Sequence, residues 1–162
     1  MKKKGFIILL VMILILVASY TIYYRYHPNI IARIEISAID DDQYESIGGL
    51  SHIKHPEKEN FSQLHFNVRV NYSKNIADVQ VDLSKTIREL LGEEVYCFGS
   101  GWNRSPEGEL QHSEEIVIYT GEIQKEKIVD LINEGQLKVN WKADGEKKSK
   151  TYNMGELVVF KK

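Results

Sequence analysis

Hydrophobic and polar positions divide the chain into two unlike parts. An uncharged run from Gly5 to Tyr24 follows three lysines, whereas apolar and polar residues alternate over much of the chain after Pro28. About twenty residues in a helix span roughly 30 Å, the thickness of the hydrocarbon core of a bilayer. The pattern predicts a transmembrane segment in residues 1–28, held by membrane lipid through residues 5–24, and a folded domain in residues 29–162.

The flanking charges predict the orientation of this segment. Lys2, Lys3 and Lys4 precede the apolar run, and Arg25 is the only charge directly after it. Because basic residues stay on the cytoplasmic side, we expect a single-pass protein of the cell membrane with a cytoplasmic N-terminus and the domain outside. The alternative is a cleaved signal peptide, which would release the domain as a secreted protein.

Residues 29–162 carry the two-residue period of half-buried strands. The clearest case is 61–72, in which Leu64, Phe66 and Val68 share one face with other apolar residues. This strand and the next, 76–83, are predicted to form an antiparallel hairpin. The remaining predicted strands lie at 31–39, 95–98, 115–120, 137–141 and 152–160.

Two short helices are predicted among these strands. Apolar residues three and four apart mark 84–91, with Ser84 as the cap and Gly92 at the end, and 124–134 repeats the spacing. About seven strands with two crossover helices favour an all-β fold, an antiparallel immunoglobulin-like β-sandwich. The alternative is an α+β fold in which both helices cover one face of the sheet.

Charge and cysteine content limit the classes of partner. All 23 acidic residues, but only 17 of the 21 basic ones, follow Pro28, so the domain carries a net charge of about −6. A negative domain lacks the basic surface that binds nucleic acid, so no nucleic-acid partner is expected. The single cysteine, Cys97, excludes an internal disulfide. This composition is typical of a bacterial envelope protein.

Two long polar segments, 43–60 and 99–113, are predicted to be loops, and they hold the candidate binding residues. Trp102, in a glycine-flanked loop, is the first candidate, because a large ring on a polar loop can anchor a partner. The competing interpretation is that it plugs one end of the sandwich. His52 and His55 are weaker candidates, since two imidazoles on a loop fall short of the three or four ligands that zinc needs.

Other reactive residues give weaker signals. Cys97 alternates with Val95, which predicts a packed thiol, and the sequence lacks the Gly-x-Ser-x-Gly motif of a nucleophile elbow. Glu114 and Glu115 are adjacent in a predicted strand, so they should point to opposite faces rather than form a catalytic dyad. No cofactor, metal or catalytic site is therefore predicted.

These observations favour a membrane-anchored extracytoplasmic binding or interaction module of a bacterial cell envelope. An envelope protein or a cell-wall polymer is the expected partner. An envelope enzyme and an accessory subunit of a membrane complex are the alternatives.

Overall fold

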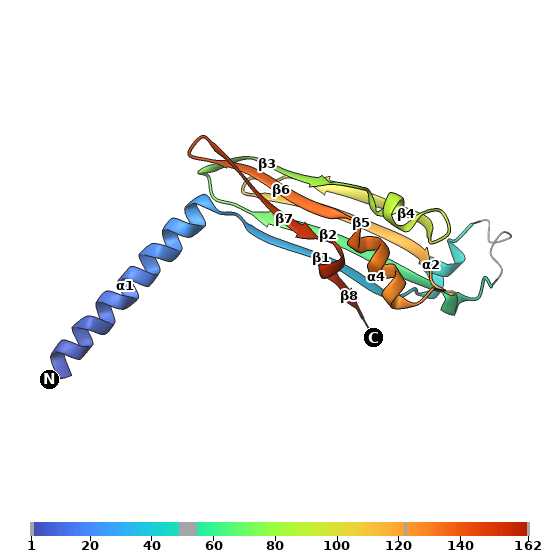
Figure 1. Ribbon diagram of the computed structural model, residues 1–162, viewed down its shortest axis with the longest axis horizontal. Coiled ribbons are helices and arrows are strands. Elements are labelled where there is room, and N and C mark those ends of the chain that lie inside the picture. The colour runs from blue at the N-terminus through green and yellow to red at the C-terminus, as the bar shows by residue number, and fades with distance from the viewer. Residues whose placement is uncertain (1, 49–54, 122, 162) are drawn as a thin grey trace.

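The computed structural model describes residues 2–48, 55–121 and 123–161, and it shows a long helix that leads into a β-rich body (Figure 1). The helix α1 spans Lys2–Tyr26. Its stretch Phe6–Tyr26 is long and apolar enough to cross a membrane, and the apolar side chains in it are exposed. The prediction of an N-terminal apolar helix of membrane-spanning length is confirmed.

Within the described residues, the body contains two β-sheets. The five-stranded sheet has the order β4-β5-β2-β1-β8, and the three-stranded sheet has the order β3-β6-β7. The strands are β1 (Asn29–Ala38), β2 (Phe61–Asn71), β3 (Ile76–Leu83), β4 (Tyr96–Arg104), β5 (Glu109–Tyr119), β6 (Gln136–Ala143), β7 (Glu146–Asn153) and β8 (Val158–Phe160). The helical segments are α2 (Asp41–Glu45), η2 (Lys58–Asn60), α3 (Ile87–Leu91), α4 (Lys125–Asn133) and η3 (Gly155–Leu157). The prediction of a mainly β domain with a few short helices is confirmed.

One hydrophobic core joins the inner faces of the two sheets. On β2 the predicted alternation holds, since Leu64, Phe66, Val68 and Val70 are fully buried. Leu137, Val139 and Trp141 of β6 belong to the same core cluster. Burial of these alternate side chains supplies the main stabilisation, at about 1.5–3 kcal/mol for each large apolar side chain.

The predicted hairpin between 61–72 and 76–83 is wrong. β2 pairs with β1 and β5, whereas β3 crosses to the other sheet and pairs with β6. Both strands have an apolar inner face, and each can bury that face only against a second layer. The turn after β2 therefore connects two sheets rather than two neighbouring strands.

The C-terminal strand also differs from the prediction. The predicted strand 152–160 is divided, because β7 ends at Asn153, Met154 is buried in the core, and β8 starts after η3. β8 runs parallel to β1, with Ile34 opposite Val158, so the fold is not wholly antiparallel. The turn between β6 and β7 contains two residues with positive φ, Asp144 (52°) and Gly145 (79°), as a tight hairpin turn requires.

The predicted loop 99–113 is mostly strand. β4 continues to Arg104, and β5 begins at Glu109 and pairs with it. The alternation was hidden because the inner face of β5 carries polar residues such as His112. In the other predicted loop, the first part forms α2, whose capping box joins Asp40 to Gln43, and residues 49–54 lie outside the described residues.

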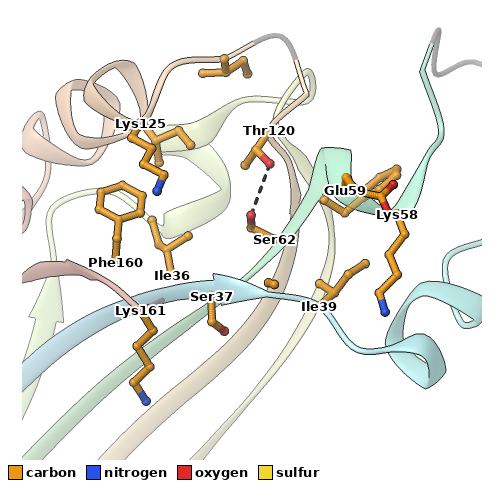
Figure 2. Close-up of a pocket in the computed structure, with 14 residues that line it drawn as sticks. Ile36, Ser37, Ile39, Lys58, Glu59, Ser62, Thr120, Lys125, Phe160 and Lys161 are labelled. Atoms are coloured by element: carbon orange, nitrogen blue, oxygen red, sulfur yellow. Dashed lines mark hydrogen bonds between the residues drawn. The ribbon is translucent and has the colours of Figure 1, made fainter.

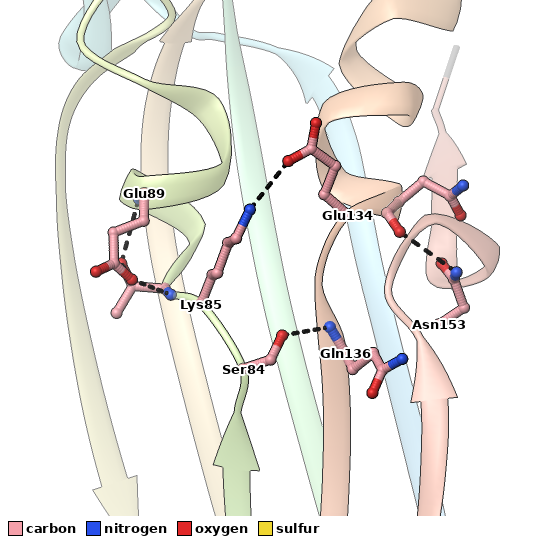
Figure 3. Close-up of polar contacts among 8 residues, drawn as sticks. Ser84, Lys85, Glu89, Glu134, Gln136 and Asn153 are labelled. Carbon is pink, nitrogen blue, oxygen red and sulfur yellow. Dashed lines mark hydrogen bonds and ion pairs between the residues drawn. The ribbon is translucent and has the colours of Figure 1, made fainter.

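The two predicted helices are confirmed as α3 and α4, but the predicted cap is wrong. Thr86, not Ser84, caps α3, since its hydroxyl accepts a hydrogen bond from the Glu89 N–H at 3.2 Å. The Ser84 hydroxyl instead accepts from the Gln136 N–H at 2.8 Å, close to an ion pair between Lys85 and Glu134 (Figure 3). These contacts join the connection after β3 to the connection before β6.

The helix α1 meets the body through aromatic contacts. The Trp141 indole Nε1–H donates to the Tyr26 carbonyl at 3.2 Å, and the His27 ring stacks on Tyr23 with the centroids 4.4 Å apart. Ser73 donates its hydroxyl to the Arg25 carbonyl at 3.0 Å. Because only two residues separate α1 from β1, these contacts fix the direction in which the body leaves the helix.

The shared core predicts a strong dependence of stability on Phe66. Phe66→Ala should lower the free energy of unfolding by about 3–5 kcal/mol, because it removes a fully buried ring and leaves a cavity. Ile31→Ala, on the exposed face of β1, should change it by no more than about 0.5 kcal/mol. Urea unfolding in mild detergent, followed by tryptophan fluorescence, measures both, and equal losses would contradict this description of the core.

Candidate binding surface on the edge strand β4

Trp102 lies on β4, the edge strand of the five-stranded sheet, and not in a loop. Its side chain is 50% exposed, and Phe98, on the same face of the strand, is 40% exposed. This outer face is turned away from the core, because Gly99 between them lies opposite the inner-facing Ile116. The structure thus differs from the interpretation that Trp102 plugs an end of the sandwich.

The strands beside Trp102 present polar side chains on the same face. Trp102 lies opposite Ser113 of β5, which lies opposite Asn67 of β2. The Ser113 hydroxyl is buried and lies 2.9 Å from Nε2 of His65. An exposed aromatic ring beside a fixed polar surface is the usual composition of a recognition site.

The Ser113–His65 pair has the residue types of a hydrolytic nucleophile and its base, but the setting does not suit catalysis. Ser113 is only 2% exposed, so a substrate cannot reach its hydroxyl. β5 is paired on both sides, with β4 and β2. Its backbone N–H groups are therefore used in the sheet and do not form an oxyanion hole. The hydrogen bond instead holds the two side chains in place on the outer face of the sheet, beside Trp102.

The inner side of β4 forms the wall of an open groove. Gly99 and Gly101 point inward beside it, where they line a separate hollow of about 290 Å³. An added Cβ at these positions would meet Ile116 at 2.7 Å and Glu114 at 3.0 Å. The groove has a volume of about 740 Å³ and runs between β3 and the β4–β5 pair. It exists because the three-stranded sheet does not extend far enough to cover β4.

His112 is the central polar residue of this groove. Its Nδ1 lies 2.6 Å from Oδ1 of Asn103, and its Nε2 lies 2.9 Å from Oε1 of Glu114. Both ring nitrogens therefore lie within hydrogen-bond distance of side-chain oxygens. The edge of its ring contacts Phe66, at a centroid separation of 5.4 Å, so the polar group borders directly on the core.

Sequence reasoning missed this group, although it placed one of its members correctly. Glu114 points into the groove and Glu115 to the outer face, as strand alternation predicts. The spacing of His112 and Glu114 could have indicated this group, because residues two apart lie on one face of a strand. Asn103 joins them only through the β4–β5 register, which local patterns do not give.

Of the two histidine candidates, His52 lies outside the described residues, and His55 is not part of this surface. His55 precedes η2 at the end of the body far from α1, and its carbonyl accepts from Asn60 at 3.0 Å. Trp102 is about 20 Å away along the strands, since Ser113 lies six residues before the Tyr119–Phe61 pair. Within the described part of the chain, no group of three or more His, Cys, Asp or Glu residues is placed to hold a metal.

A second cavity of about 500 Å³ lies near α4, with an apolar floor that includes Ile36 and Phe160 (Figure 2). Lysines lie at its rim, and two of them are paired with carboxylates. Lys58 pairs with Asp41, Lys161 pairs with Glu35, and Lys125 lies over the Phe160 ring. Figure 2 shows the amines of Lys58 and Lys161 directed away from the Ser62–Thr120 contact in the middle. The cavity therefore offers little polar recognition.

Cys97 lies in a second, smaller cluster on the outer face of the five-stranded sheet. This cluster contains the buried residues Ile39, Phe61 and Val117, and Cys97 packs against it half-buried. Burial raises the pKa of the Cys97 thiol above its ordinary value, and a hydrogen bond from the Tyr119 backbone offsets part of that effect. A raised pKa leaves less thiolate at neutral pH, which is the opposite of what a cysteine nucleophile needs.

No protein-family model matches the sequence, and no curated protein matches it.

The environment of Cys97 predicts slow alkylation. At pH 7 iodoacetamide should modify Cys97 severalfold more slowly than an exposed cysteine introduced by Ser105→Cys in a Cys97→Ser background, because burial raises the thiol pKa and restricts access. The rate at Cys97 should still be rising at a pH where the rate at the exposed cysteine has levelled. In denaturant the two rates should become equal. Rapid labelling of folded Cys97 at neutral pH would instead indicate an activated thiol.

Proposed function

We propose that this chain is a single-pass membrane protein of a bacterial cell envelope whose extracytoplasmic domain is a binding module. α1 supplies the anchor, because its exposed apolar side chains have no protein cover in the described structure and lipid can provide that cover. The lysines before the apolar run 5–24 and the tyrosines at its far end support a cytoplasmic N-terminus. The partner is another envelope protein or a cell-wall polymer.

The observation that carries this proposal is the exposed pair Trp102 and Phe98 on the uncovered outer face of β4. Exposed aromatic side chains that share one face of an edge strand can mark a site of protein interaction. Tryptophan is also the residue type most enriched at positions that dominate binding energy. The fixed polar groups beside it, Ser113 and His65, can supply orientation.

We also infer that the body is an immunoglobulin-like sandwich. The order β4-β5-β2-β1 in one sheet and β3-β6-β7 in the other corresponds to the ABED and CFG sheets of the constant-type arrangement, with β8 added beside β1. Such sandwiches often serve as interaction domains at cell surfaces. That likeness agrees with a binding role, but it does not select the partner.

The membrane topology can be tested by labelling intact cells. In a Cys97→Ser background, a membrane-impermeant maleimide should modify Ser105→Cys, which lies in the exposed turn between β4 and β5. It should modify Lys3→Cys only after the membrane is permeabilised. Mass measurement of the mature protein should find the N-terminal segment intact. Labelling of Lys3→Cys alone in intact cells, or a chain that begins near residue 20, would overturn the topology.

The binding role can be tested by photo-crosslinking in living cells. A benzoylphenylalanine placed at Trp102 should give a discrete crosslinked product, because this ring is proposed to lie in the interface. The same probe at Val159, which is 40% exposed on the far edge strand β8, should not give that product. Protease or muramidase treatment then tells a protein partner from a wall polymer. Absence of any product specific to position 102 would refute this binding surface.

A further inference from the structure

The two sheets end in four edge strands, and three of them carry the features that block pairing with another chain. β8 has only three residues, and β7 contains Lys147, Lys148 and Lys150. β3 has an irregular register between Ala77 and Gln80 and carries two aspartates. Short length, charge and bulges are the recognised means by which proteins protect sheet edges.

β4 lacks this protection over most of its length. It has nine residues, of the sequence Tyr-Cys-Phe-Gly-Ser-Gly-Trp-Asn-Arg, and its only charge is Arg104 at the end. A register shift lies at its start, between Tyr96 and Phe98, and regular pairing follows as far as Arg104. The segment 98–103 is therefore an uncharged, regular and exposed edge.

The hydrogen-bond pattern shows which backbone groups of this edge face outward. The Tyr119 N–H donates to the Val95 carbonyl at 2.8 Å, so the odd-numbered residues of β5 bond toward β4. In the register, Ser113 is the partner of Trp102 and Glu115 is the partner of Ser100. Because residues alternate in an antiparallel ladder, the backbone N–H and C=O groups of Gly99, Gly101 and Asn103 point away from β5.

The side chains on the two faces of this edge differ in a way that suits an added strand. On the outer face, the exposed rings of Trp102 and Phe98 would lie beside the side chains of an added strand. On the inner face, Gly99 and Gly101 line a hollow of about 290 Å³ that shares Asn103 with the larger groove, and Val81 and Leu83 of β3 are only partly buried across that groove. Large side chains of an added strand would enter this hollow, as aromatic residues pack opposite glycine in paired strands.

A second copy of the chain fits this edge poorly. Antiparallel pairing of β4 with itself needs a twofold axis perpendicular to the sheet. Figure 1 shows α1 leaving the body along the plane in which the strands lie side by side. That axis would therefore point the second α1 in the opposite direction, and two copies anchored in one membrane cannot satisfy this geometry.

We propose that β4 is the docking site for an extended polypeptide segment of a partner protein, which adds to the five-stranded sheet as a further strand. The segment carries large apolar side chains at alternate positions, and these enter the hollow that Gly99 and Gly101 line. Its other side chains lie beside Trp102. This inference rests on the proposed binding function and narrows the partner from an envelope component to a polypeptide strand.

Two substitutions at one position separate backbone pairing from side-chain contact. Asn103→Ala and Asn103→Pro both remove the amide that contacts His112, but only proline also removes an outward N–H. Proline is tolerated at such an edge position because that N–H is not used in the ladder. Thr151→Pro, on the exposed edge strand β7, controls for a general effect of proline.

The probe is a synthetic peptide in which Phe and Thr alternate between terminal lysines. With the full chain in nanodiscs, millimolar peptide should slow hydrogen–deuterium exchange at the backbone amides of residues 98–103 severalfold. The protection should persist in Asn103→Ala and in Thr151→Pro and should fall markedly in Asn103→Pro. The same peptide with alternate amides N-methylated on the pairing edge should give no protection.

The inference is overturned if the peptide leaves these amides unprotected, if the N-methylated peptide protects them equally, or if protection appears on another edge. Protection that rises with protein concentration without peptide would identify a second copy as the occupant and would also overturn it. The photo-crosslink at Trp102 decides the proposed function separately. A product at Trp102 together with unprotected β4 amides would leave the binding function standing and remove only the strand-addition mode.

Discussion

The structure depends on burial of alternate side chains between two sheets of unequal width. Five strands face three, and the core is continuous only where both layers are present. On the β1 side, α4 and η3 complete the cover, and Ile128 and Ile132 of α4 are buried in the same core. On the β4 side, α3 covers the start of the strand, where Arg88 lies over the Tyr96 ring, and no described helix covers the inner face from residue 99 onward. The mismatch in width thus produces both the groove and the exposed edge.

The inner face of β4 shows how the sequence accommodates this gap in the cover. A strand whose inner face meets water gains nothing from large apolar residues there, and β4 has glycine at 99 and 101 and asparagine at 103. On the neighbouring strand, His112 and Glu114 satisfy each other and Asn103 at the point where the core ends. His112 and Glu114 are partly buried, and polar groups withdrawn from water need such partners, since an unsatisfied buried one costs about 1–3 kcal/mol. These polar side chains therefore form the border of the core and leave the groove open.

Much of the fold could be predicted from local patterns, because those patterns reflect burial on one face. The strands around Leu64 and Val139, the helices ending near Gly92 and Gly135, and the turn at Asp144-Gly145 were all recognisable in this way. Pairing was not, since the sequence of β2 fits a hairpin with β3 as well as it fits β1 and β5. The choice depends on which faces meet across the whole domain, which is a property of distant residues.

The candidate site was only partly predictable for the same reason. Trp102 was singled out as a recognition candidate and is exposed in the structure, yet it was placed in a loop because glycines and polar residues usually mark one. The structure gives those glycines a different explanation, as the small inner face of an uncovered strand. His112 and Asn103 could not be connected without the register between β4 and β5.

The junction with α1 adds a constraint on how β4 can be reached. Trp141 joins the core of the smaller sheet to the last turn of α1, so the body cannot rotate freely about the helix. If α1 is fixed in a bilayer, the edge of β4 has one orientation relative to the membrane surface. A strand-forming partner must then approach from that side, which favours a segment that is itself held at the same membrane over one that diffuses in solution, because tethering raises its effective concentration.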